Sequence, residues 1–244
     1  MSTLNLLVPV MAGLIGGLAG IFLGGRITRD VKIILAFSGS YLFALTILHL
    51  FPQVYHEGGS EIGIFILVGF LAQIVLDFFS KGVEHGHIHK SDQLAKNFPL
   101  GIFLALFIHS FIEGLPLTEI QNSEHHGHVH FNSNELLAGI AIHKIPEAIA
   151  LAALVYHYYN SSIKTLLIIL MYCTATPLGI LLGSFLTGGT FENPELVYNR
   201  TLSFAIGIFI HVSTTILFEA EEHHKFNWRK IIAILAGLGL VLFL

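Results

Sequence analysis

Two short stretches of the sequence place a histidine four residues before a glutamate. They are HSFIEG, which holds His109 and Glu113, and HKIPEA, which holds His143 and Glu147. Side chains four residues apart on an α-helix lie one turn apart and about 40° apart around the axis. Each stretch therefore offers one imidazole and one carboxylate on a single face. Two such helices facing each other would supply two nitrogen and two oxygen donors around a common point.

These donors suit a divalent metal ion. Imidazole and carboxylate groups bind Zn(II), Fe(II) and Mn(II), and no thiolate is required. One such histidine alone could serve only in packing, and Glu147 could pair with Lys144, but two matching couples favour a metal site. We predict that His109, Glu113, His143 and Glu147 bind one ion, with Zn(II) as the first candidate and Fe(II), Mn(II) or Cd(II) as alternatives.

The segments that carry these residues are apolar enough to lie in lipid. The chain of 244 residues is 54% hydrophobic and 11% charged, with a mean hydropathy of +0.74, whereas a soluble domain has about 25% charged residues. A helix needs about 20 apolar residues to cross a bilayer. We predict an all-α polytopic membrane protein with one transmembrane transporter domain, residues 1–244. Its eight predicted spans cover residues 4–25, 33–54, 62–79, 99–120, 135–156, 163–186, 201–218 and 228–244.

Basic residues gather in alternate loops between these spans. One set of loops holds Arg26, Arg29, Lys32, Lys81, Lys90, Lys96, Lys164, Lys225, Arg229 and Lys230. The opposite set holds only Arg200, and Lys144 is the one basic residue that lies away from the ends of a predicted span. Because cytoplasmic loops carry the excess of Lys and Arg, both termini are predicted to be extracytoplasmic. The formal charge of −4 and the lack of a basic run argue against a nucleic-acid partner.

Proline and glycine residues near the two couples predict irregular helices. Pro146 cannot donate a backbone hydrogen bond, so it leaves the carbonyl of Ile142 without its helical partner. Gly114 and Pro116 weaken the fourth span in the same way. Interrupted helices at mid-membrane are common in transporters, where they line a cavity.

Other histidines lie in loops or alone on a span. Those in loops could capture metal outside and accept or sense it inside, or could be solvated residues that metal reaches incidentally. His49 and His211 each stand alone on a span and could either pack with a hydrogen bond or act as ligands along a pathway. The loop histidines are His85, His87, His89, His125, His126, His128, His130, His223 and His224.

With these motifs, the chain resembles the ZIP (Zrt/Irt-like) family of divalent-metal transporters. HSFIEG is similar to the family's His-Asn-x-x-Asp/Glu-Gly, and HKIPEA is similar to its His-x-x-Pro-Glu/His pattern. The resemblance implies that the family's metal ligands fall on the same four residues. It also implies a homodimer, and a bundle of spans one, four, five and six that slides against spans two, three, seven and eight.

Three positions differ from the pattern of many family members. Ser110 and Lys144 stand where those members bind a second metal ion, and Thr176 stands where some present a glutamate before a proline. Serine is a poor ligand and an ammonium cannot bind a cation. We therefore predict a centre for a single metal ion, with Lys144 supplying a fixed positive charge in place of the second ion.

These features predict a transporter that moves a divalent cation toward the cytoplasm. The metal is cargo, and no cofactor is expected. An intramembrane zinc-dependent hydrolase with the same four ligands is one alternative, although the H-E-x-x-H motif is missing, and a metal sensor that never moves its ion is another. An exporter could use the same site, since ligands do not encode direction. Partners would be membrane lipid and the metal ion, and the compact chain suggests a bacterial cytoplasmic membrane.

Overall fold

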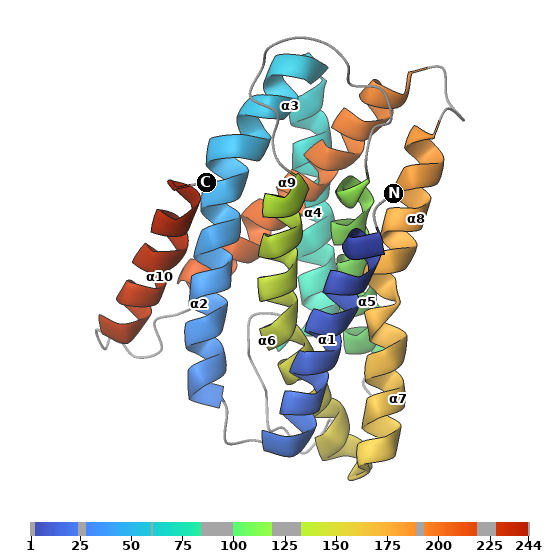
Figure 1. The fold of residues 1–244 in the computed structure, drawn as a ribbon, viewed down its shortest axis with the longest axis vertical. Coiled ribbons are helices and arrows are strands. Elements are labelled where there is room, and N and C mark those ends of the chain that lie inside the picture. Colours follow the sequence, from blue (N-terminus) through green and yellow to red (C-terminus); the bar gives the residue numbers. More distant parts are fainter. Residues whose placement is uncertain are drawn as a thin grey trace.

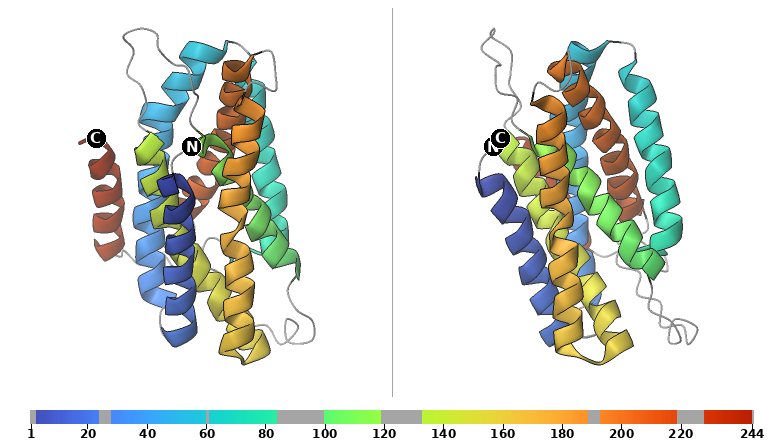
Figure 2. Two further views of the ribbon diagram at one scale, coloured as in Figure 1. Left: turned by 45° about the vertical axis from the view of Figure 1, so that its right-hand side comes forward. Right: turned by 90° about the vertical axis from the view of Figure 1, so that its right-hand side faces the viewer.

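The structure is a computed structural model that describes residues 3–23, 28–59, 61–83, 100–118, 133–188, 193–218 and 228–243. Within these ranges the regular structure is helical and there is no strand, which confirms the all-α prediction. The helices form an elongated bundle (Figures 1 and 2). The α-helices are α1 (Thr3–Leu23), α2 (Thr28–Leu45), α3 (Phe51–Gly58), α4 (Ile62–Ser80), α5 (Leu100–Gly114), α6 (Ser133–Tyr159), α7 (Ser162–Cys173), α8 (Ala175–Thr187), α9 (Pro194–Phe218) and α10 (Trp228–Val241). A π-helical turn, η2 (Thr46–Leu50), joins α2 to α3, and a 3-10 turn, η4 (Leu115–Leu117), extends α5.

Seven helical segments in the described part are long and apolar enough to cross a membrane. Large apolar side chains cover their outer surfaces, for example Ile64, Leu67 and Phe78 on α4. Such a surface is stable in hydrocarbon, so the protein is an integral membrane protein. The seven segments are Thr3–Phe22, Val31–His56, Ile62–Ser80, Leu100–Leu117, Asn134–Tyr159, Ser162–Thr187 and Pro194–Phe218.

The eighth predicted span corresponds to α10, which is shorter. Its 14 residues extend over about 21 Å, less than the roughly 30 Å of a hydrocarbon core. It packs along α2, and its role as a span remains a prediction. The start of α1 and the end of α10 lie toward the same end of the bundle (Figure 1).

The closest helix pairs join segments that are distant in the sequence. The most extensive contacts are between α1 and α6, α4 and α9, α2 and α10, and α5 and α8. The pairing of α5 with α8 depends on Gly179, because a Cβ atom there would collide with the backbone carbonyl of Phe111 on α5. Close packing through small residues is typical of helices in membranes.

The helix interruption lies in the sixth span and not in the fifth. The helix α6 runs through Pro146 without a break, so any irregularity that this proline causes in the fifth span does not end the helix. In the sixth span, α7 ends at Cys173, four residues before Pro177. A proline ring clashes with the carbonyl four residues earlier, which explains the break. The fourth span narrows to a 3-10 turn at Pro116, as predicted.

The seventh span begins at Pro194, earlier than the predicted residue 201. The side-chain oxygen of Asn193 accepts a hydrogen bond of 3.1 Å from the backbone N–H of Leu196. Asparagine is a favourable N-cap, and proline is favourable in the first helical position. The cap extends the helix into a polar stretch whose composition alone does not predict a membrane span.

Candidate metal centre

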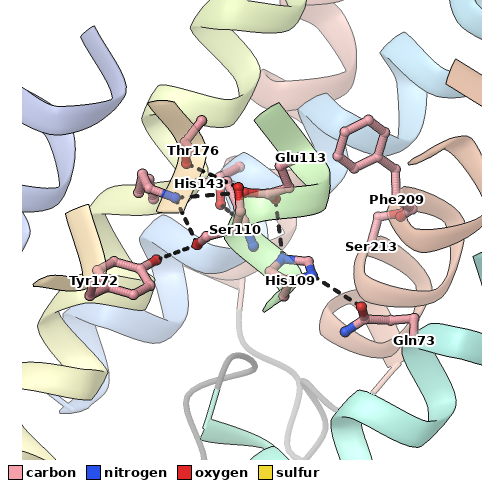
Figure 3. A network of polar contacts seen from close by, with 11 residues as sticks. Gln73, His109, Ser110, Glu113, His143, Tyr172, Thr176, Phe209 and Ser213 are labelled. Atoms are coloured by element: carbon pink, nitrogen blue, oxygen red, sulfur yellow. Dashed lines mark hydrogen bonds and ion pairs between the residues drawn. The ribbon is translucent and has the colours of Figure 1, made fainter. Parts of the chain in front are cut away.

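The histidine–glutamate couples of α5 and α6 meet inside the bundle. Donor atoms of His109, Glu113 and His143 all lie within 4.8 Å of one another, and the three side chains are buried. Within the α5 couple, Nε2 of His109 is 3.1 Å from Oε1 of Glu113. The planes of the two imidazole rings make an angle of 73°, an edge-on arrangement, with the ring centroids 6.3 Å apart. Three of the four predicted ligands therefore converge as their spacing on the two helices predicts (Figure 3).

The fourth predicted ligand, Glu147, lies one helical turn beyond His143 and is fully buried. It is not one of the three groups whose donor atoms converge within 4.8 Å. It interacts electrostatically with Lys144, His109 and Glu113, so it belongs to the same polar centre. By distance and angle neither of its oxygens has a hydrogen-bond partner among the described residues, although Tyr172 is near enough to interact with it.

Lys144 is buried beside these ligands and points toward α5. Its Nζ donates a hydrogen bond of 2.8 Å to Oγ of Ser110 and lies 3.8 Å from Oε2 of Glu113. The same ammonium is 5.0 Å from the centroid of the Tyr172 ring. Its exposed fraction is 0%, so its charge is compensated inside the protein rather than by water.

Ser110 connects Lys144 to the helices of the sixth span. Its hydroxyl donates to Oη of Tyr172 on α7 over 2.9 Å, while its backbone carbonyl accepts from Oγ1 of Thr176 on α8 over 3.1 Å. Hydrogen bonds thus link the three departures from the family pattern, Ser110, Lys144 and Thr176. Figure 3 shows Ser110 and Thr176 beside His109 and Glu113.

Two side chains from other helices hold the site histidines, and the sequence reasoning missed both. On α4, Oε1 of the buried Gln73 lies 3.0 Å from Nδ1 of His109. On α2, Oγ of Ser38 lies 3.4 Å from Nδ1 of His143 and donates its proton to the carbonyl of Leu35. It therefore accepts from Nδ1–H.

A partner at Nδ1 assigns the tautomer of a metal-binding histidine. With Nδ1 protonated, both rings keep the lone pair of Nε2 for a metal ion. Gln73 could have been found from the sequence as an amide in an otherwise apolar span, because intramembrane polar groups mark functional sites. The pairing of Ser38 with His143 has no such signal.

The remaining predicted histidines lie elsewhere. Nδ1 of His49 is 3.0 Å from Oε2 of Glu135, and the His211 ring packs edge-on against Phe70 on α4. Neither belongs to the three-residue cluster. The loop histidines His85, His87, His89, His125, His126, His128, His130, His223 and His224 lie outside the described residues.

Comparison with known proteins agrees with this geometry. The model of the ZIP zinc transporter family matches residues 98–244, a range that contains α5, α6 and both histidine–glutamate couples. No curated protein matches the chain. Members of this family are transporters of divalent metal ions rather than enzymes. A family match over more than half of the chain, together with membrane-spanning helices and a buried histidine–glutamate cluster, shows that this chain belongs to the ZIP zinc transporter family.

Proposed function

We propose that the protein carries zinc across the membrane toward the cytoplasm, and that His109, Glu113, His143 and Glu147 bind the ion on the way. The observation that carries this proposal is the convergence of donor atoms of His109, Glu113 and His143 within 4.8 Å, all buried, on two membrane-spanning helices. A buried set of nitrogen and oxygen donors suits a divalent ion that has lost most of its water.

Charge also favours a bound dication. Glu113 and Glu147 are both buried, and ionised carboxylates in an apolar interior are costly unless they are paired. The ammonium of Lys144 compensates one of the two negative charges. A dication would compensate the other and leave the centre with a net positive charge. Zn(II) accepts this donor set, and Fe(II), Mn(II) and Cd(II) are alternative cargoes.

We further propose that the centre takes one ion. The ammonium of Lys144 lies against Ser110 and 3.8 Å from Glu113, beside the ligands where other family members would bind a second ion. A second dication next to this ammonium would be repelled by it. The hydroxyl of Ser110 donates its proton to Tyr172 and accepts a hydrogen bond from Lys144, so it is already engaged and does not offer itself to a second ion.

Transport requires the centre to open to each side in turn. His109, His143 and Glu147 have exposed fractions of 0%, so an ion reaches them only after a movement of helices. The helix pairs with the most extensive contacts, α1–α6, α5–α8, α4–α9 and α2–α10, each lie inside one of the two groups suggested by family resemblance. This packing supports a movement in which α1, α5, α6, α7 and α8 shift as a unit.

The orientation follows from the basic loops. We propose that α10 forms the eighth span together with the apolar residues after it, that both termini are extracytoplasmic and that residues 1–244 form one domain. The direction of transport, a homodimer, a bacterial cytoplasmic membrane and a role of the loop histidines in metal capture are proposals of the same kind. The direction of transport and the homodimer rest on family resemblance, and the orientation rests on the distribution of Lys and Arg. The bacterial membrane rests on the compact chain, and the capture role rests on the histidine-rich loops.

Zinc flux into proteoliposomes tests the function. Wild-type protein should accumulate zinc inside vesicles without any peptide or lipid substrate. Glu113→Gln and Glu147→Gln should each lower zinc flux by at least about 10- to 100-fold, the loss in metal affinity or activity that follows when even a residue behind a metal ligand is replaced. Glu61→Gln is the matched control, because Glu61 is an exposed glutamate paired with Arg200 at 2.8 Å. Metal binding without flux would indicate a sensor and contradict the proposal.

A further inference from the structure

A second imidazole–carboxylate pair lies at one end of α2 and α6. His49 is in the π-helical turn η2, and Glu135 is in the first turn of α6. Nδ1 of His49 is 3.0 Å from Oε2 of Glu135, with exposed fractions of 29% and 13% for the two side chains. Unlike the buried centre, this pair is partly exposed at the surface of the bundle.

The pair and the buried centre share one seam between α2 and α6. On α6, Glu135 precedes His143 by eight residues, or about 12 Å along the axis. Ser38 on α2 contacts His143 at one level, and His49 on the following turn η2 contacts Glu135 at the other. The packed elements on either side of this seam thus carry one polar contact near the end of α6 and another at the buried centre.

Tyr41 closes this seam between the two sites. Its hydroxyl donates to the backbone carbonyl of Glu135 over 3.1 Å, and the side chain is buried. Its ring lies against Gly139 on α6, where an added Cβ would be 2.8 Å from the ring atom Cε1. An ion held at His49 and Glu135 would be separated from His143 by this ring until α2 and α6 move apart.

The π turn that carries His49 has a cause in the sequence. Pro52 follows the turn and cannot donate a hydrogen bond to the carbonyl of Leu48. The backbone N–H of Phe51, the residue before it, bonds to the carbonyl of Thr46. This bond spans five residues where an α-helix spans four, so the turn is wider by one residue. Single π turns inside α-helices are frequent at functional sites.

We propose that His49 and Glu135 form an outer metal site, where a divalent cation arriving from outside exchanges part of its water before it enters the centre. The proposal rests on the proposed function and orientation. One nitrogen and one carboxylate, completed by water, repeat the donor chemistry of the centre with fewer protein ligands. Such a site binds weakly, as a site on a pathway must if the ion is to leave it again.

Substitutions at position 49 separate metal binding from a simple ion pair. His49→Asp keeps a metal ligand but replaces the attraction to Glu135 by repulsion. His49→Lys keeps the attraction to Glu135 but removes the ligand. For an outer metal site, His49→Lys should raise the KM for zinc flux about tenfold with little change in maximal rate, a loss of about 1.4 kcal/mol, whereas His49→Asp should stay near the wild-type KM. The opposite order would show that the pair acts as a latch, and would overturn the proposal.

The controls are an exposed ion pair and a binding measurement that needs no transport. Arg200→Ala removes the exposed pair with Glu61 and should leave the KM unchanged. Cadmium(II) binding is then measured by equilibrium dialysis on full-length protein with His143→Ala and the loop histidines replaced by serine. One weak site should remain, persist in His49→Asp and disappear in His49→Lys and Glu135→Ala. If all three bind cadmium(II) equally, the outer site does not exist, whether or not the wild-type protein transports zinc.

Discussion

Replacing Lys144 by methionine removes the charge beside the metal centre while keeping a side chain of similar length. In the structure the Lys144 ammonium lies 3.8 Å from Oε2 of Glu113 and 2.8 Å from Oγ of Ser110, with no exposure to solvent. Methionine can fill the same space but can neither donate a hydrogen bond nor compensate a carboxylate. Lys144→Met therefore leaves Glu113 with His109 as its remaining close partner.

The size of the effect follows from the distance. Two unit charges 3.8 Å apart attract by about 4 kcal/mol at an effective dielectric constant of 20, and removing one partner of a buried pair costs about 3–5 kcal/mol. Without metal, Lys144→Met should lower the free energy of unfolding by a similar amount. For a chain of this size that corresponds to a fall in Tm on the order of 10 °C.

Metal should reverse this loss. A dication at His109, Glu113 and His143 neutralises Glu113 in place of the ammonium, and it no longer meets a positive charge. Zinc should therefore bind Lys144→Met at least about tenfold more tightly than it binds the wild type. A tenfold change requires about 1.4 kcal/mol, which is less than half of the attraction of about 4 kcal/mol between Lys144 and Glu113. The difference in Tm between variant and wild type should shrink when zinc is added.

Thermal unfolding in detergent, with and without zinc, measures the first effect, and competition with a chelator measures the second. Both proteins carry serine in place of the loop histidines, so that only the membrane centre binds. The control is Lys164→Met, since Lys164 is an exposed lysine whose Nζ lies 5.3 Å from the Tyr159 ring. Weaker zinc binding by Lys144→Met, or an equal loss of Tm with and without zinc, would refute the role of Lys144 as a fixed charge beside the ion.

Three further perturbations follow from the same structure. Gln73→Leu should weaken zinc binding by about 10- to 100-fold, while Gln73→Glu, which keeps an acceptor for Nδ1 of His109, should lose less; chelator competition compares the two. Zinc uptake should fall as the external pH is lowered from about 7.5 to about 5.5, because protons compete for imidazoles that must be neutral to bind metal; unchanged uptake would argue against histidine ligands. Gly179→Val should prevent α8 from packing on α5 and abolish folded protein in size-exclusion chromatography, whereas Gly239→Val, in open space, should not.

The centre can be predicted from the sequence because it depends on the spacing of residues within single helices. A separation of four residues on a helix places His109 over Glu113 and His143 over Glu147. Because polar groups are costly to bury in lipid, the two couples are expected to share one site. His109, Glu113 and His143 converge as this spacing predicts, and their role as metal ligands stays a prediction. The position of Glu147 as a ligand stays a prediction, since it lies in the same polar centre without joining the cluster.

What the sequence does not predict depends on contacts between distant helices. Gln73 and Ser38 reach the histidines across 36 and 105 residues of chain, and no periodicity within one helix indicates such pairs. The fate of the prolines has the same origin. Pro146 and Pro177 are equivalent as residues, yet the helix continues through the first and ends four residues before the second, so a proline in the sequence does not by itself predict a break.

X-ray absorption at the zinc edge, on full-length protein with the loop histidines replaced by serine, tests the central claim most directly. A zinc ion in the proposed centre should show two imidazole nitrogens and carboxylate oxygens at about 2.0–2.2 Å, without sulfur, at one ion per chain. The double variant His109→Ala, His143→Ala should lose that signal. Two results would contradict the account: zinc that keeps the same histidine ligands in the double variant, or no bound zinc in the protein that lacks only the loop histidines.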